Sequence, residues 1–232
     1  MCLAAVALYF AWDWYGPQGY AAVEYDGRRV KYLHRVTAEA GPEAELPMII
    51  FLHGYGGRAH HHPSDFKAAF FPARLIFPRA PFARHTSWYD PEEREETLPR
   101  AAEMIAGLTR ALTERYPTKG KPVLYGFSQG GVTALYCAIW YPSLYSAVLA
   151  EGAFLDASFL PSALNPAEEY PPVYQFHGTK DMIILLEEGQ RTAAALRGLG
   201  VPGRFYALDA GHRCLYDHQG KIIFDTLAEV CP

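Results

Sequence analysis

The chain has 232 residues, of which 50% are hydrophobic and 20% are charged, so it is long enough to bury one sizeable core. Its formal net charge is −4, with both signs spread along the chain, and this excludes the basic surface on which nucleic-acid binding depends. We therefore predict one α/β domain over residues 1–232, with neither a nucleic-acid partner nor an obligate membrane partner. Composition does not specify the oligomeric state.

Residues 1–20 form an N-terminal extension whose role the sequence leaves open. Residues 3–11 are apolar but too short to span a bilayer. They lack the basic start and the small-residue cleavage pattern of a secretory signal. We expect an extra strand or helix on the core and a cytoplasmic location. The alternative is the remnant of an export signal or anchor on a secreted or periplasmic protein.

The first regular elements are two strands in residues 22–36, joined by Asp26-Gly27, a strong hairpin signal. After a polar loop, residues 46–52 form a continuous apolar run, as expected of a central parallel strand that is buried on both faces. This strand ends in His53-Gly54-Tyr55-Gly56-Gly57. A glycine-rich turn in this position leaves backbone N–H groups accessible, so we assign the Tyr55 N–H as a donor to developing negative charge. The alternative is a loop without a role.

Three adjacent histidines, His60, His61 and His62, follow this loop. Adjacent side chains do not converge on one metal ion unless the loop folds for it, and no cysteine or carboxylate cluster surrounds them. We expect a solvated loop and no metal, with substrate contact at the mouth of a cleft as a further alternative. The next strand, 74–78, leads into an aromatic loop, 79–90, in which Trp88 and Tyr89 either wall a substrate cleft or pack the loop.

Residues 97–116 have apolar positions three and four apart, which predicts an amphipathic helix with Thr97 as its N-cap. It connects to residues 121–141, which read as a short apolar strand, a turn and a second helix. Residues 126–130 of the turn read G-F-S-Q-G, the pattern that holds a nucleophilic serine at a sharp strand-to-helix turn. The Gln129 N–H follows Ser128 at the start of the helix, where it can bind developing negative charge. The alternative is a serine that only caps the helix.

Three more strands, 145–150, 172–176 and 204–208, and two helices, 186–199 and 217–230, complete the chain. The segment 155–172 is too short for a large lid. The strand 172–176 is followed by Asp181, and the strand 204–208 by His212. We expect Phe154, Ile183, Trp88 and Tyr89 to contact substrate.

Ser128, Asp181 and His212 therefore each follow a predicted parallel strand, at the edge where open α/β sheets place their sites. Their order along the chain is that of a nucleophile, an acid and a base in hydrolases that carry such a turn. Asp156 and Asp209 are alternative acids, and His177 and His218 are alternative bases.

Several motifs together resemble the phospholipase/carboxylesterase family, which includes the acyl-protein thioesterases. They are His53-Gly54, Ser87-Trp88-Tyr89-Asp90, G-F-S-Q-G-G at 126–131, H-G-x-x-D at 177–181, and Gly211-His212. The resemblance implies an α/β-hydrolase fold with a mostly parallel central sheet, an antiparallel N-terminal hairpin, helices on both faces and no large lid. It implies a serine esterase that acts on a small-molecule ester, without metal or organic cofactor, through Ser128, His212 and Asp181.

Two departures from the family pattern concern the substrate. Gly57-Arg58 stands where an aspartate is usual, and Met182 to Leu186 replaces a Val-Pro pair. A carboxylesterase is the main prediction; an acyl-thioesterase or lysophospholipase, and a polyester or feruloyl esterase, are the alternatives. Outside esterases, a serine peptidase or a non-catalytic binding protein of the same fold remains. Among four cysteines, Cys137 is expected to be buried, and a disulfide between Cys214 and Cys231 is left open.

Overall fold

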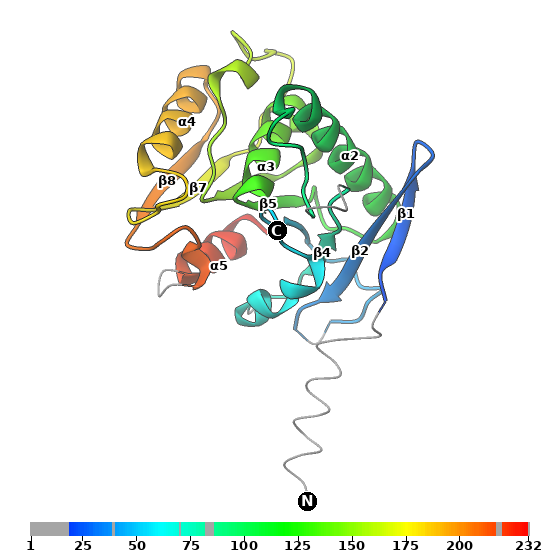
Figure 1. Ribbon diagram of the computed structural model, residues 1–232. Helices are drawn as coiled ribbons and strands as arrows, with labels where there is room; N and C mark the ends of the chain where they lie inside the picture. Colours follow the sequence, from blue (N-terminus) through cyan, green and yellow to red (C-terminus); the bar gives the residue numbers. More distant parts are fainter. Residues whose placement is uncertain (1–18, 39, 70, 82–85, 217–219, 232) are drawn as a thin grey trace, which may run out of the picture.

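The computed structural model describes residues 19–38, 40–69, 71–81, 86–216 and 220–231. The prediction for the apolar segment 3–11 lies outside these residues, as does the alternative base His218. The described part contains an eight-stranded sheet in the order β1-β2-β4-β3-β5-β6-β7-β8 (Figure 1). Its strands are β1 (Ala21–Tyr25), β2 (Arg28–Val36), β3 (Met48–Leu52), β4 (Arg74–Pro78), β5 (Val123–Phe127), β6 (Ala147–Glu151), β7 (Val173–Gly178) and β8 (Gly203–Leu208).

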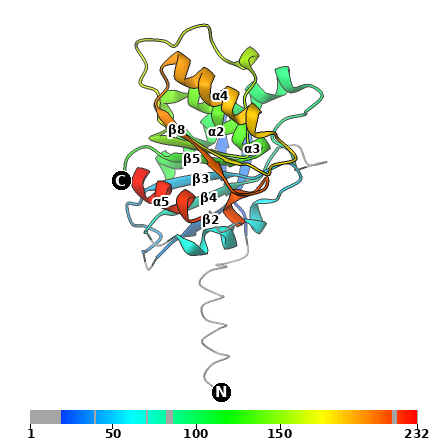
Figure 2. The same ribbon diagram turned by 90° about the vertical axis from the view of Figure 1, so that its left-hand side faces the viewer.

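The helices of the described part cover both faces of this sheet. Figure 2 shows α2, α3 and α4 on one face and α5 on the other. Their bounds are α2 (Arg94–Arg115), α3 (Gln129–Trp140), α4 (Leu186–Leu199) and α5 (Gly220–Val230). Short 3-10 helices occur in the loops: η1 (Ala59–His61), η2 (Pro63–Ala68), η3 (Pro142–Leu144), η4 (Ala157–Phe159) and η5 (Cys214–Tyr216).

The N-terminal hairpin is the antiparallel part of the sheet. β1 pairs with β2 and β2 with β4 in antiparallel register, whereas every pair from β4 to β8 is parallel. Asp26 and Gly27, between β1 and β2, both have positive φ, 48° and 69°, which is the geometry of a tight hairpin turn. The hairpin, the mostly parallel sheet and the helices on both faces are confirmed.

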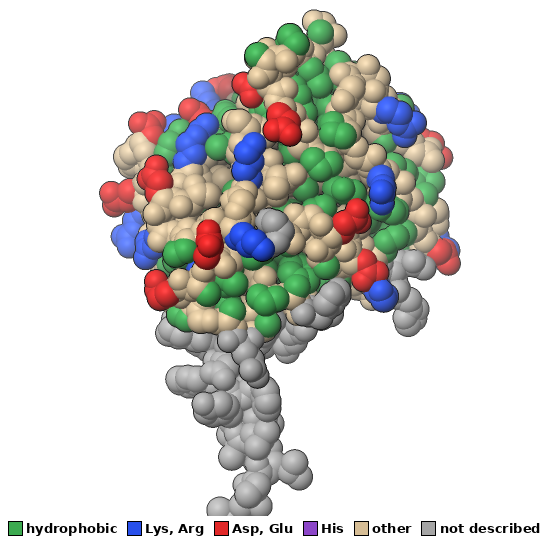
Figure 3. Space-filling model, turned by 180° about the vertical axis from the view of Figure 1, so that it is seen from behind, with side chains coloured by type: hydrophobic (Ala, Val, Ile, Leu, Met, Phe, Trp, Pro, Cys, Tyr) green, Lys and Arg blue, Asp and Glu red, His purple; other side chains and the backbone are tan. Residues whose placement is uncertain are grey.

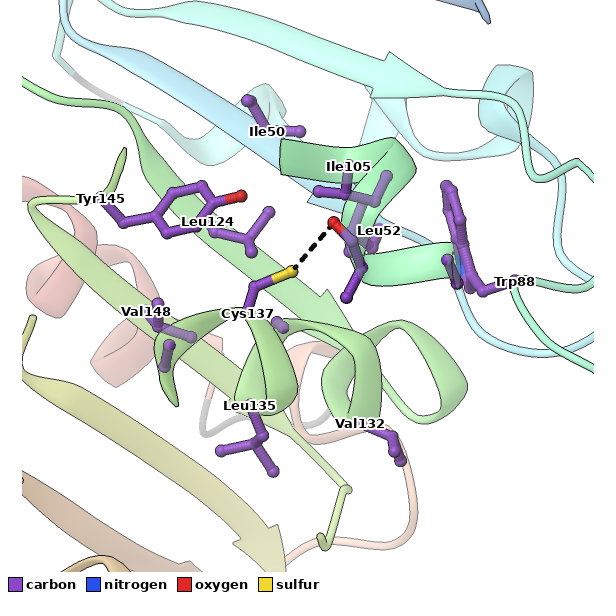
Figure 4. Packing of buried hydrophobic residues seen from close by; sticks show 14 of the residues in the cluster. Ile50, Leu52, Trp88, Ile105, Leu124, Val132, Leu135, Cys137, Tyr145 and Val148 are labelled. Carbon is purple, nitrogen blue, oxygen red and sulfur yellow. Dashed lines mark hydrogen bonds between the residues drawn. The ribbon is translucent and has the colours of Figure 1, made fainter. Parts of the chain in front are cut away.

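Each face of the sheet has its own apolar core. On the α2 and α3 face, Ile50, Leu124 and Val148 of the sheet pack with Ile105 and Leu135, all of them fully buried. In Figure 4 the Cys137 side chain points from α3 toward Leu52 and Leu124, and its thiol lies 3.8 Å from the carbonyl oxygen of Ala102. On the opposite face, the aromatic rings of strands β3 to β5 meet η2 and α5.

The prediction for the start of α2 is wrong. The helix begins at Arg94, and Thr97 lies buried in its first turn instead of capping it. The Thr97 hydroxyl donates to the Glu93 carbonyl and accepts from the Asp90 N–H, so it connects the preceding loop to the helix. Two glutamates in the first turn, Glu95 and Glu96, favour the earlier start because they interact with the positive end of the helix dipole.

Two further sequence-based questions are answered by the fold. Cys137 is buried, as predicted, and Cys231 carries a free thiol, so the disulfide with Cys214 does not form. The second question concerns the segment 155–172. It contains the short η4, and its Phe159 carbonyl accepts a hydrogen bond from the exposed Trp140 of α3.

On the face seen in Figure 3, basic and acidic side chains are scattered and do not gather by sign.

Candidate active site

Ser128 lies between β5 and α3 in a backbone conformation that few L-residues adopt, with φ 52° and ψ −120°. Neighbouring glycines make this turn possible. A Cβ on Gly126 would lie 2.2 Å from the carbonyl oxygen of Gly130, and a Cβ on Gly130 would lie 2.2 Å from that of Leu52. The start of α3 therefore approaches β5 and the end of β3 too closely for a side chain at Gly126 or Gly130. The turn holds the serine in its strained conformation.

His212 connects Ser128 to Asp181 through hydrogen bonds at both ring nitrogens. Its Nε2 lies 3.0 Å from Ser128 Oγ, and its Nδ1 lies 2.7 Å from Asp181 Oδ2. The Asp181 carboxylate is fixed in turn, because its Oδ1 accepts from the backbone N–H groups of Ile183 at 2.8 Å and Ile184 at 3.0 Å. The structure brings together the three residues that were predicted to form a nucleophile, a base and an acid.

Close backbone packing positions the loop that carries His212. Gly152, with φ 53°, lies so near that a Cβ on it would be 2.6 Å from the His212 carbonyl oxygen. A Cβ on Gly178, at the end of β7, would lie 2.0 Å from the carbonyl oxygen of Gly211. The Phe127 ring packs against the imidazole with 5.0 Å between ring centroids. The loop that carries His212 therefore packs between the ends of β6 and β7 and the turn that carries Ser128.

The two predicted donors to negative charge lie on segments next to Ser128. Gln129 is the first residue of α3, so its N–H lies at the positive end of the helix dipole. Tyr55 lies in a turn closed by a 3.0 Å hydrogen bond from the Gly57 N–H to the Gly54 carbonyl. That turn packs on the serine, because a Cβ on Gly54 would lie 3.3 Å from the Ser128 Cβ.

The Gln129 side chain is a structural feature that the sequence analysis did not single out. It is buried, and its amide contacts three consecutive residues of the aromatic loop, Ser87, Trp88 and Tyr89. The Trp88 indole N–H donates to the His53 carbonyl oxygen at 2.6 Å. The aromatic loop is therefore connected to both the serine turn and the His53 loop.

Trp88 does not wall a cleft as expected, because its side chain has no exposed surface. Tyr89 is also buried, and its burial raises the pKa of its hydroxyl. Both pack the loop, which was the alternative interpretation. Of the other predicted substrate contacts, Phe154 is half-buried, and Ile183 is exposed beside Asp181.

Two hollows in the surface adjoin the segment that follows β6. One, of about 140 Å³, has Phe154 and α4 among its walls. The other, of about 480 Å³, lies between residues 91–96 and 156–159 and is lined mainly by acidic side chains, with Arg94 bonded to Asp156. Arg94 also lies over the Phe154 ring, 5.1 Å from its centroid.

The histidine cluster differs in part from its prediction. His60 and His61 are exposed, but His62 is buried, where its Nδ1 binds Asp65 Oδ2 at 2.8 Å and its ring stacks on His53. Burial lowers the pKa of His62 despite the carboxylate. Among the residues that the structure describes, no group of three or more His, Cys, Asp or Glu side chains could hold a metal ion.

The alternative acids that are described pair with other residues, and the alternative base His177 lies beside Asp181. Asp209 pairs with Lys180 at 2.6 Å on the surface, and Asp156 pairs with Arg94. His177 is buried, with its Nε2 2.9 Å from the Ile184 carbonyl oxygen and 3.4 Å from Asp181 Oδ2. His177 therefore lies near the same carboxylate oxygen that binds His212.

No helix in the described part of the chain is long and apolar enough to cross a membrane.

Comparisons with known proteins place this geometry in context. A family model described as Phospholipase/Carboxylesterase matches residues 34–222. Mouse lysophospholipase-like protein 1 is 26% identical over 183 residues, which cover 69% of this chain and 77% of that protein. Acyl-protein thioesterase 1 of Schizosaccharomyces pombe is 28% identical over 159 residues, 61% of this chain and 71% of that protein.

Solved structures show the same fold. The crystal structure of Zea mays acyl-protein thioesterase 2 has a TM-score of 0.68 at 20% identity, covering 85% of this chain and 98% of that one. The structure of esterase PE8 also has a TM-score of 0.68 at 20% identity, covering 87% and 99%. The predicted α/β-hydrolase fold is confirmed.

Proposed function

Because the chain belongs to the phospholipase/carboxylesterase family of hydrolases, we propose that it is a serine carboxylesterase that uses Ser128, His212 and Asp181. The observation that carries the proposal is the continuous hydrogen-bond chain from the serine hydroxyl to the buried carboxylate, at 3.0 and 2.7 Å. These distances suit proton transfer from Ser128 to His212.

In the proposed reaction, His212 Nε2 takes the proton of Ser128 Oγ as that oxygen attacks the carbonyl carbon of an ester. The negative charge that forms on the carbonyl oxygen is bound by the backbone N–H groups of Tyr55 and Gln129. His212 then gives its proton to the departing alcohol oxygen, which leaves an acyl group on Ser128. Water, activated by the same imidazole, releases the carboxylic acid and restores the serine.

In this reaction Asp181 orients the His212 imidazole. Its carboxylate accepts a hydrogen bond from His212 Nδ1, which leaves Nε2 free to receive the serine proton, and it stabilises the imidazolium that forms. The backbone N–H groups of Ile183 and Ile184 hold the other carboxylate oxygen, so the orientation of the carboxylate toward His212 is fixed.

Apolar surface beside the site supports an ester with an apolar acyl or alcohol group as substrate. Met182 and Ile183, directly after Asp181, are 90% and 73% exposed. The half-buried Phe154 follows β6 near the same edge of the sheet. The short segment 155–172 supports open access to the serine, because it contains no large lid. An acyl-thioesterase or lysophospholipase is the second candidate, favoured by the names of the relatives.

The experiment is hydrolysis of p-nitrophenyl butyrate by purified wild-type protein and the Ser128→Ala variant. We expect kcat to fall by roughly 10⁶-fold, as when the nucleophile of a serine hydrolase is removed. Ser143→Ala, at an exposed serine of η3, is the matched control and retains wild-type kcat. Hydrolysis by Ser128→Ala at more than about one-hundredth of the wild-type rate would exclude the proposal. Paired oxygen esters and thioesters of one acyl chain then separate the two candidates by kcat/KM.

A further inference from the structure

A mostly buried group of charged and phenolic side chains adjoins the loop that carries His212, and the proposed reaction does not use it. We call it the Arg213 cluster. It consists of the buried Asp65, Tyr125, Glu151 and Arg213 side chains and of the exposed Tyr216, whose hydroxyl donates to Asp65. Its members come from η2, β5, β6 and the loop after β8. Arg213 directly follows the predicted base in the sequence, so any contact that fixes Arg213 also constrains His212.

Glu151 connects this cluster to the serine turn. Its side chain is fully buried at the end of β6, and its backbone carbonyl accepts the Ser128 N–H at 2.8 Å. One carboxylate oxygen accepts from the Leu215 N–H at 2.8 Å and the other from the Tyr125 hydroxyl at 2.5 Å. The second oxygen also lies 3.7 Å from Arg213 Nε, within ion-pair distance. A single residue therefore contacts both the serine turn and the loop that carries the base.

Arg213 connects the same loop to the segment that follows Tyr55. Its Nη2 lies 2.9 Å from Asp65 Oδ2, and Asp65 also binds His62, which stacks on His53. The guanidinium packs over the Phe127 ring, 4.3 Å from the ring centroid. Only 11% of the Arg213 side chain is exposed.

The charge of Arg213 is retained in this setting. Burial acts to lower the pKa of Arg213, but the carboxylates of Glu151 and Asp65 outweigh it and the pKa is raised. Burial and the neighbouring Glu151 carboxylate raise the pKa of Tyr125 well above its usual value, so Tyr125 stays protonated and donates. The cluster thus pairs one buried cation with two buried anions, and removing the cation leaves both anions uncompensated.

We propose that Arg213 is a positioning residue for the proposed esterase reaction, fixing His212 relative to Ser128 and to the Tyr55 turn through Glu151, Asp65 and Phe127. This proposal rests on the proposed function. The loop that carries His212 lies outside regular secondary structure, so side-chain contacts add to the close backbone packing at Gly152 and Gly178 in holding it. Directional ion pairs and ring stacking by a planar guanidinium suit this task better than apolar packing does.

The test compares Arg213→Met with wild-type protein, with active sites counted by complete reaction with a fluorophosphonate. Because a small misplacement of a reacting group slows the chemistry, we expect kcat per active site to fall about 10- to 100-fold, while KM changes less than about threefold. Arg213→Lys keeps the charge and recovers part of the loss. The matched control is Arg74→Met, which removes the fully buried arginine at the start of β4, whose guanidinium lies over the Tyr116 ring. It retains wild-type kcat per active site.

A wild-type kcat per active site in Arg213→Met would overturn the inference and leave the cluster with a role in stability alone. A change confined to KM would overturn it as well. Failure of the proposed function is recognised separately, because Ser128→Ala would then remain active. If Arg213→Met yields no soluble protein, Asp65→Asn carries the test, and a wild-type kcat per active site in that variant overturns the inference.

Discussion

Replacing Gln129 by methionine tests how the aromatic loop is held on the serine turn. The substitution keeps the length of the side chain but removes its amide, which accepts from the Trp88 N–H at 2.9 Å and donates to the Tyr89 carbonyl at 2.9 Å. The carbonyl keeps the Ser87 hydroxyl as a partner, whereas the buried Trp88 N–H loses its acceptor.

The expected cost follows from these contacts. An orphaned buried donor costs about 1–3 kcal/mol, and the lost bond to the carbonyl adds about 1 kcal/mol, so Gln129→Met should lower the free energy of unfolding by about 2–4 kcal/mol. Urea unfolding followed by tryptophan fluorescence and far-ultraviolet circular dichroism measures this, with the denaturant slope unchanged.

The matched control is Gln175→Met. Gln175 is equally buried, but its amide donates a hydrogen bond of 3.5 Å to Gly189, at the limit of such contacts, so its replacement should cost under about 1 kcal/mol. If both variants lost the same free energy, or Gln129→Met lost less than about 0.5 kcal/mol, the amide would not hold the loop as we infer.

Three further outcomes are expected. Asp181→Asn should lower kcat about 10⁴-fold with little change in stability, because an amide at this position favours the wrong tautomer of His212; steady-state kinetics at constant pH measure this. Gly178→Ala should yield little folded protein, because the new Cβ would lie 2.0 Å from a backbone oxygen, whereas Gly198→Ala, with open space around its Cβ, should raise Tm. Burial lowers the pKa of His53 to about 4 from 6.5, so the unfolded chain binds more protons here and the free energy of unfolding should fall as pH decreases from about 6.5 to about 4. Urea titrations across this range, with a shallower pH slope in His53→Gln, check the last prediction; an unchanged slope contradicts it.

The sequence predicted the fold well because the elements carry strong local signals. The apolar run in β3, the Asp26-Gly27 turn and the Gly-Pro stop after α4 each specify one local conformation. Glycines at Gly126 and Gly130 are required by close backbone approach, which is why the serine turn could be recognised from five residues.

Environments of single side chains were harder to predict, because they depend on what packs from distant segments. Trp88 was expected at a cleft wall, yet its indole N–H finds its acceptor inside, on His53. His62 was expected in solvent, but Asp65 and the His53 ring surround it. In both cases an amphipathic side chain can satisfy its polar atom either in water or in the interior, and only tertiary packing decides which.

The Arg213 cluster gave a weak signal in the sequence. Glu151 ends an apolar strand and Arg213 follows the predicted base, and a charged residue in either position is more often exposed than buried. The two residues are far apart in the chain, so nothing in their spacing indicates that they form an ion pair. Their buried pairing becomes evident once β6 and the loop after β8 are placed side by side.

In the proposed reaction, Ser128 forms an acyl-enzyme with His212 as its base. The most direct measurement is the mass of the intact protein after reaction with a fluorophosphonate, followed by identification of the labelled peptide. We predict one added phosphonyl group on Ser128 in the wild-type protein, none in Ser128→Ala and greatly slowed labelling in His212→Ala. Labelling at another residue, or equal labelling of all three proteins, would show that Ser128 is not the nucleophile activated by His212.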